Sequence, residues 1–228
     1  MSLMRFKQII DQKRLYFLLV TASAVLLIVG SLRFLYELML VSGNLVLEDI
    51  RSGKAVSRDE LALLEQSRLK ALNFAKSSAA YDDLGASYYA RVRDAATIGE
   101  QRIYALKAIE ASMESLKLAP LNTFAWFRVA TSNVLLGPEH YEMAIEAWRK
   151  SISTANYEPT LLKQRVHLGV ILYQNMTTDD IELLKNQLVL AYRTNREELR
   201  EYGRRHNLTA WFTFLSESGS RMAIFLSK

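Results

Sequence analysis

Histidine, serine and acidic side chains are the residues of this chain that could do chemistry, and their spacing matches no known catalytic or metal-binding pattern. The histidines are His140, His167 and His206, and no two stand four residues apart, as a helical metal-binding pair would. The absence of cysteine excludes disulfides, thiolate ligands and cysteine nucleophiles. The sequence also has no nucleophile elbow and no glycine-rich phosphate loop. We therefore expect no catalytic residue, no metal and no cofactor.

Two carboxylate pairs, Asp82-Asp83 and Asp179-Asp180, resemble the acid and base of a hydrolase at first sight. Both pairs stand near the expected start of a helix, where negative charge is favourable because of the helix dipole. His206 closes the run "REELREYGRRH", where a cationic side chain suits a helix C-terminus. We interpret these residues as structural, and an enzyme stays the third hypothesis, with a glycan-modifying activity.

The elements that hold these residues are predicted to be helices. Only 3 prolines and 9 glycines occur in 228 residues, and no run alternates apolar and polar residues as a half-buried strand would. The fold class predicted is all-α. The net charge of +5 is concentrated in residues 1–14, so the nearly neutral remainder does not favour nucleic-acid binding.

A membrane-spanning helix is predicted at 15–40, because 18 uncharged residues run from Leu15 to Leu32 and apolar character resumes after Arg33. The basic tail at 1–14 predicts a cytoplasmic N-terminus and a periplasmic C-terminal domain in the inner membrane of a bacterium. A cleaved signal peptide is the alternative, since Ala22, Ser23 and Ala24 have the small-residue form of a cleavage site. Residues 41–56 are expected to be a linker.

Helix pairs are predicted to fill the domain at 57–228. Short turns join consecutive helices, which favours antiparallel neighbours. Caps, capping boxes and first-turn prolines mark where the helices begin, at Ser57 with Glu60, Thr97 with Glu100, Asn122, Pro138, Pro159, and Thr178 or Asp179.

The helix pairs share a pattern. Tyr81-x2-Leu84-Gly85-x2-Tyr88, Trp126-x2-Val129-Ala130 and Leu168-Gly169-x2-Leu172 open successive pairs. Small residues follow in the second helices, at Ala108, Ser112 and Ser115 and again at Ala144 and Ser151, with Trp148 and Pro120 at their own repeat positions. The pattern resembles the tetratricopeptide repeat over 78–192, although the spacings of 45 and 39 residues exceed its 34. An irregular helical bundle is the alternative.

The resemblance implies a concave groove lined by the first helix of each pair, which binds a protein partner. The positions matched to its contact residues are Asp82, Ala86, Tyr89, Phe127, Thr131, Val134, Lys163, Val166 and Tyr173. Residues 193–228 are expected to be capping helices. This segment could instead fill the groove, bind a partner through Trp211, Phe212 and Phe214, or contact anionic lipid through its arginines.

The layout of one membrane span and a helical-repeat domain is similar to the VpsP family of exopolysaccharide biosynthesis accessory proteins. That resemblance implies a non-enzymatic scaffold whose partners belong to polysaccharide polymerisation or export. An adaptor in protein secretion, pilus assembly or cytochrome maturation is the second hypothesis. Membrane lipid is the expected contact of 15–40, and an oligomer stays open.

Overall fold

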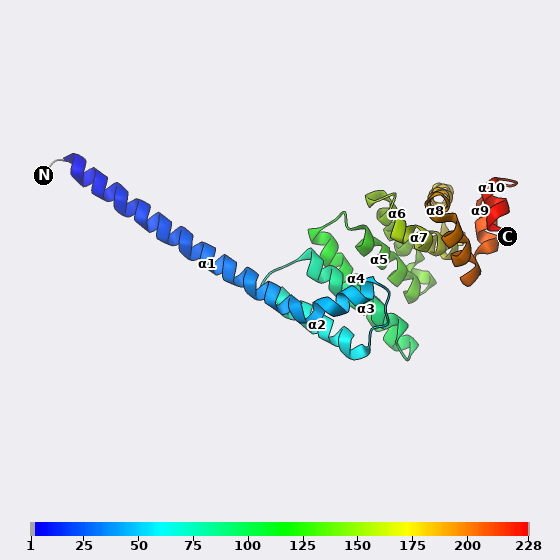
Figure 1. Cartoon of the computed structure of the whole chain (residues 1–228), viewed down its shortest axis with the longest axis horizontal. Coiled ribbons are helices and arrows are strands. Elements are labelled where there is room, and N and C mark those ends of the chain that lie inside the picture. Colours follow the sequence, from blue (N-terminus) through cyan, green and yellow to red (C-terminus); the bar gives the residue numbers. More distant parts are fainter. Residues whose placement is uncertain (1–2, 228) are drawn as a thin grey trace. The chain divides into compact units, whose positions relative to one another are not determined.

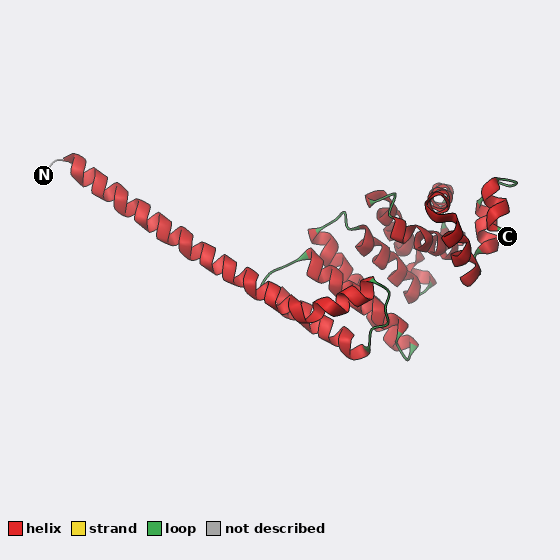
Figure 2. Ribbon diagram, in the orientation of Figure 1, coloured by secondary structure: helices red, strands yellow, loops and turns green. Residues whose placement is uncertain are grey.

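The computed structural model describes residues 3–227, with side chains described from Leu15 onward. This part of the chain consists of helices, turns and loops without a strand (Figure 2). The predicted all-α class is confirmed. The α-helices, labelled in Figure 1, are α1 (Leu3–Arg51), α2 (Arg58–Leu72), α3 (Ser78–Arg93), α4 (Ile98–Leu118), α5 (Thr123–Leu136), α6 (Tyr141–Thr154), α7 (Pro159–Leu172), α8 (Thr178–Arg205), α9 (Thr209–Leu215) and α10 (Arg221–Leu226). Two short 3-10 helices are η1 (Pro138–His140) and η2 (Tyr173–Asn175).

The chain divides into two compact units, Met1–Ala80 and Tyr81–Lys228. In the first unit, α1 is long and apolar enough to cross a membrane from Leu15 onward, and its most apolar stretch is wholly exposed. The C-terminal part of α1 packs on α2. At this contact the buried Arg68 donates hydrogen bonds of 2.8 Å to the Leu40 carbonyl and 2.9 Å to Asn44 Oδ1.

The helix α1 runs further than the sequence predicts. Residues 41–56 are expected to be a linker, whereas α1 continues to Arg51. Val46 and Leu47 bury their side chains against Leu64 of α2, so packing holds this stretch in the helical state. The turn follows at Gly53, whose φ of +76° is readily adopted only by glycine.

In the second unit, successive helices pack on one another, with α5 lying against both α4 and α6, and α7 against α8. The small residues predicted to sit between paired helices are fully buried: Ala108, Ser112, Ser115, Ala144 and Ser151. Trp148 is also fully buried, and its indole N–H donates to the Arg165 carbonyl at 3.0 Å. A close helix approach with one large side chain filling the remaining space explains why these residue types occur here.

Local capping sets the helix starts, as the sequence indicates. Ser57 and Glu60 form the predicted capping box, and Asn122 Oδ1 accepts from two amides of α5. Thr97 accepts from the Glu100 amide, but the Glu100 carboxylate accepts from the Ala96 amide, so only half of that box forms. The N-cap of α8 also differs from the prediction, since it is neither of the two residues predicted for it.

The predicted cap of α8 at Thr178 or Asp179 is wrong by one or two residues, because Thr177 is the N-cap and Asp180 closes the box. Asp180 can do this since it stands three residues after Thr177, where its carboxylate reaches the Thr177 amide at 2.9 Å. The same carboxylate also forms an ion pair with Arg149 of α6, whose Nη2 lies 2.6 Å from Oδ2.

The long helix α8 contains a break that the sequence does not announce. Asn195 has non-helical backbone angles, φ −158° and ψ 92°, and its Oδ1 accepts from the Glu198 amide at 3.1 Å. Asn195 thus acts as an N-cap inside α8. The part of α8 after the break packs on α9, where Gly203 lies against the ring of Phe212.

Candidate functional site

The six residues predicted to line the groove are all half-buried, on three helical elements and one short turn of the second unit. They are Asp82 and Tyr89 on α3, Phe127 and Thr131 on α5, Lys163 on α7, and Tyr173 in η2. Ala86 and Val134 are half-buried too, but Val166 is completely buried. The prediction of Val166 as a contact residue is therefore wrong, because its side chain belongs to the core around Trp148.

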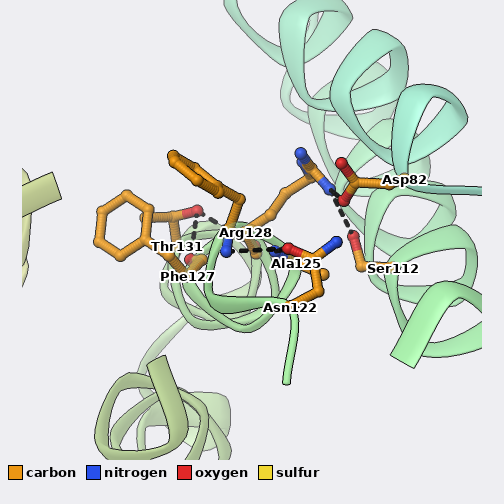
Figure 3. Close-up of polar contacts among 8 residues, drawn as sticks. Asp82, Ser112, Asn122, Ala125, Phe127, Arg128 and Thr131 are labelled. Atoms are coloured by element: carbon orange, nitrogen blue, oxygen red, sulfur yellow. Dashed lines mark hydrogen bonds and ion pairs between the residues drawn. The ribbon is translucent and has the colours of Figure 1, made fainter. Parts of the chain in front are cut away.

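At the first of these positions, Asp82 already has a partner within the chain. Arg128 of α5 lies 2.9 Å from the Asp82 carboxylate and donates to Ser112 Oγ of α4 at 3.3 Å (Figure 3). Both ion-pair members are largely shielded from solvent, with side chains 11% and 20% exposed. This contact joins α3, α4 and α5. Asp82 is consequently a structural anion rather than a free ligand for a partner.

The two residues predicted on α5 differ from Asp82, because their polar bonds stay within one helix. Thr131 Oγ1 donates to the carbonyls of Phe127 and Arg128, both at 3.1 Å. The ring of Phe127 packs against the edge of the main core and is half-buried. Of the two predicted α5 residues, Phe127 therefore presents an apolar ring that is partly accessible.

At the third pair of helices, Lys163 is directed toward α8. It forms an ion pair with Glu198, and its Nζ lies 5.8 Å from the centre of the Tyr202 ring. Lys163 therefore ties α7 to the segment that follows the Asn195 break. As with Asp82, the charge of Lys163 is therefore paired with a group of the same chain.

Next to Lys163, the structure brings together two histidines that are far apart in the sequence. His167 Nδ1 lies 3.0 Å from the Tyr202 hydroxyl, and the ring centres of His167 and His206 are 5.1 Å apart. Burial lowers the pKa of His167, helped by the nearby His206, and burial raises the pKa of Tyr202. The spacing of Tyr202 and His206, four residues on one helix, is the signal that could have indicated their contact.

Tyr89 of α3 adds to the raised pKa of Tyr202. Among the residues with described side chains, no group of three or more histidines and carboxylates is placed to hold a metal ion. The cluster thus brings the ring of Tyr202 together with two imidazole rings.

Tyr173, the last predicted position, borders an apolar recess. Trp211 and Phe214 of α9 place their ring centres 5.2 and 5.8 Å from that of Tyr173. With Ala210 these rings line an open hollow of about 270 Å³. Phe214 is 63% exposed, whereas Phe212 points into the core and is 1% exposed.

The predicted roles of α9 are thus divided between its residues. Phe212 covers the core, as a capping helix would require, and Trp211 and Phe214 contact a groove position from outside. The sequence indicates Tyr173 and the α9 aromatic residues as separate candidates and does not predict that they lie side by side. Their contact depends on how α9 folds back toward η2, and no local pattern encodes that.

The chain matches no family model and no curated protein.

Proposed function

We propose that this chain is a membrane-anchored helical-repeat protein that binds a partner protein and catalyses no reaction. The span at 15–40 would cross the bacterial inner membrane, with the N-terminus in the cytoplasm and the second unit in the periplasm. The length and apolar surface of α1 support the anchor. The basic residues before the span support this orientation, because positive flanks stay in the cytoplasm.

The packing of the second unit supports a tetratricopeptide-like stack. A Cβ added to Gly85 would come within 2.7 Å of Ser112 in the paired helix, and one added to Gly169 within 2.5 Å of Leu184. Ala130, at the equivalent position of the middle pair, is completely buried. The small residue of each opening helix thus lies at a tightly packed position, as the repeat requires.

A fourth pair extends this stack beyond the region matched from sequence. The second part of α8 and α9 repeat the relationship, because a Cβ on Gly203 would lie 2.8 Å from the Phe212 ring. Gly203 follows Gly169 by 34 residues, the period of the repeat. We therefore assign 196–215 to a fourth helix pair, and α10 to the cap.

The recess of Tyr173, Trp211 and Phe214 carries the proposal of partner binding. Exposed aromatic rings around an apolar hollow are typical of the anchor pockets of protein interfaces, where tryptophan and tyrosine are enriched. The recess offers few polar groups, which fits an apolar side chain of a partner helix or peptide better than a sugar. The exopolysaccharide machinery is the assembly that we propose for this partner.

The test is photo-crosslinking in cells with a light-activated amino acid at position 214. Glu182, exposed on α8 outside the recess, is the matched control position. We expect a specific adduct with an envelope protein from position 214 and none from position 182. Equal adducts from both positions, or none from either, would contradict the proposal. An adduct with a secretion, pilus or cytochrome-assembly component would replace the pathway and keep the binding site.

A further inference from the structure

We infer that α1 pairs in parallel with α1 of a second copy of this chain, so that the functional unit is a membrane-anchored dimer. The inference rests on the proposed anchoring, because two copies in one membrane with one orientation can only meet in parallel. The interface is a row of residues that we call the α1 seam, made of Phe34, Leu38, Val41 and Leu45.

The α1 seam follows the spacing of a coiled coil. Its members are separated by 4, 3 and 4 residues, which is the heptad alternation that keeps one stripe facing an identical helix. All four side chains are exposed, and Leu45 is the most exposed at 75%. Toward the membrane the same spacing continues through Ser31, Leu27 and Ala24, so the stripe extends into the span. It ends at Glu48, the next position after Leu45.

Lipid covers only part of this stripe. Leu45 stands 12 residues after Arg33, which is about 18 Å of helix. The uncharged run ends at Leu32, so Val41 and Leu45 lie beyond the hydrocarbon core on the water side. Exposure of Val41 and Leu45 to water is unfavourable, and covering them with another apolar surface removes this cost in free energy.

The packing of α2 leaves the α1 seam free for such a contact. Buried residues of α1 that face α2 are Tyr36, Gly43, Val46 and Leu47. At 100° per residue they lie on the side of the helix opposite to the seam. The hairpin of α1 and α2 is therefore complete without the seam, and the second unit of the chain is not needed to form it.

The charges beside the α1 seam favour a second copy over a charged partner. Glu37 is paired with Arg33 of its own helix at 2.5 Å, and Asp49 with Lys54 at 2.6 Å. Glu37 and Asp49 are thus compensated within their own chain, and the acidic Glu48 ends the stripe. The four members of the α1 seam are uncharged, so two identical copies can approach along it without like charges, and the seam presents no charge that an oppositely charged partner would recognise.

Single-cysteine crosslinking tests the dimer directly, since the natural chain has no cysteine. Val41→Cys and Leu45→Cys are placed in the seam, and Gln66→Cys, exposed on α2, is the matched control. Under mild oxidation in membranes we expect disulfide dimers from both seam variants, at about ten times the yield of the control, because a disulfide needs close Cα atoms. Any such dimer joins two chains, as each chain holds one thiol.

A charge variant gives an independent readout on the purified full-length protein. Leu45→Glu places two like charges against each other in the dimer, whereas Gln66→Glu adds the same charge away from the seam. We expect the detergent-solubilised mass to fall from two chains to one for Leu45→Glu alone. Absence of disulfide dimers at both seam positions, or an unchanged mass for Leu45→Glu, would overturn the inference. Recovery of the cysteine variants in the soluble fraction would instead refute the proposed anchoring, and the seam crosslink would still be scored.

Discussion

Gly203 of α8 lies so close to Phe212 of α9 that a Cβ at this glycine would come within 2.8 Å of the ring. Because a real Cβ contact is never that short, Gly203→Ala should push α9 away and destabilise the second unit by about 1–3 kcal/mol. Gly99→Ala is the control, since its added Cβ meets nothing closer than 3.8 Å. Urea unfolding of the full-length protein in detergent, followed by tryptophan fluorescence, measures both. Equal stability of the two variants would contradict the assignment of a fourth helix pair.

Arg165 of α7 is a completely buried cation whose bonds reach α5, the C-terminal end of α6 and Gln187 of α8. Its guanidinium donates to the Ala155 carbonyl at 2.9 Å, to Ser151 Oγ at 3.0 Å and to Thr123 Oγ1 at 2.5 Å. Burial lowers its pKa to about 10, so it stays charged at neutral pH. The last carbonyls of α6 take the place of a carboxylate, because a helix C-terminus is partly negative.

We therefore expect Arg165→Lys to be destabilising, although the charge is kept. A lysine ammonium cannot reproduce the fork of donors, so buried acceptors lose their partners at a cost of about 1–3 kcal/mol. Thermal unfolding of the full-length protein measures the loss, and Lys150→Arg on the exposed face of α6 is the conservative control. A wild-type melting temperature for Arg165→Lys would show that the network is not needed.

Acid sensitivity should come from the ion pair of Arg149 and Asp180. Arg149 lowers the pKa of Asp180 to about 2, with help from Thr177. The unfolded state then binds more protons between the ordinary carboxyl pKa and pH 2, so stability is full above about pH 4 and is lost as the pH falls through this window. The shift corresponds to roughly 2 kcal/mol. Asp180→Asn should flatten this part of the stability–pH curve, and an unchanged curve would rule out the pair as its cause.

A second pH effect is expected from His167 at milder acidity. Burial and His206 lower its pKa, so the folded state favours the neutral ring. The unfolded state takes up the proton first as the pH drops below about 6.5, and the stabilisation is lost from there downward. His167→Gln should remove this component, whereas His140→Gln, at a turn outside the cluster, should keep it. Unfolding curves at pH 7.5 and pH 5.5 for the three proteins decide the matter.

Local features account for what the sequence predicts well. The capping box at Ser57 and the cap at Asn122 depend only on residues two or three positions away, so their pattern is readable. The buried small residues, such as Ala144 and Ser151, are predictable because a repeated spacing fixes the face of each helix. The apolar run from Leu15 is likewise a property of composition alone.

The missed features depend on contacts between distant segments. Asn195 stands in a polar run that reads as continuous helix, and only the packing of α8 reveals that the chain breaks there. The contact of His167 with His206 requires α7 and α8 to lie together, so no helical spacing could announce it. The recess beside Tyr173 has the same origin, because Tyr173 and Phe214 meet only through the return of α9.

The central claim, that a membrane-embedded α1 presents the second unit in the periplasm, is tested most directly by labelling a cysteine placed on that unit. Asn186→Cys is suitable, since Asn186 is exposed on α8 and the natural chain has no other thiol. Spheroplasts are treated with a maleimide that cannot cross membranes, before and after lysis. We expect full labelling of membrane-bound protein in intact spheroplasts. Labelling only after lysis, or recovery of the protein in the soluble fraction, would contradict it.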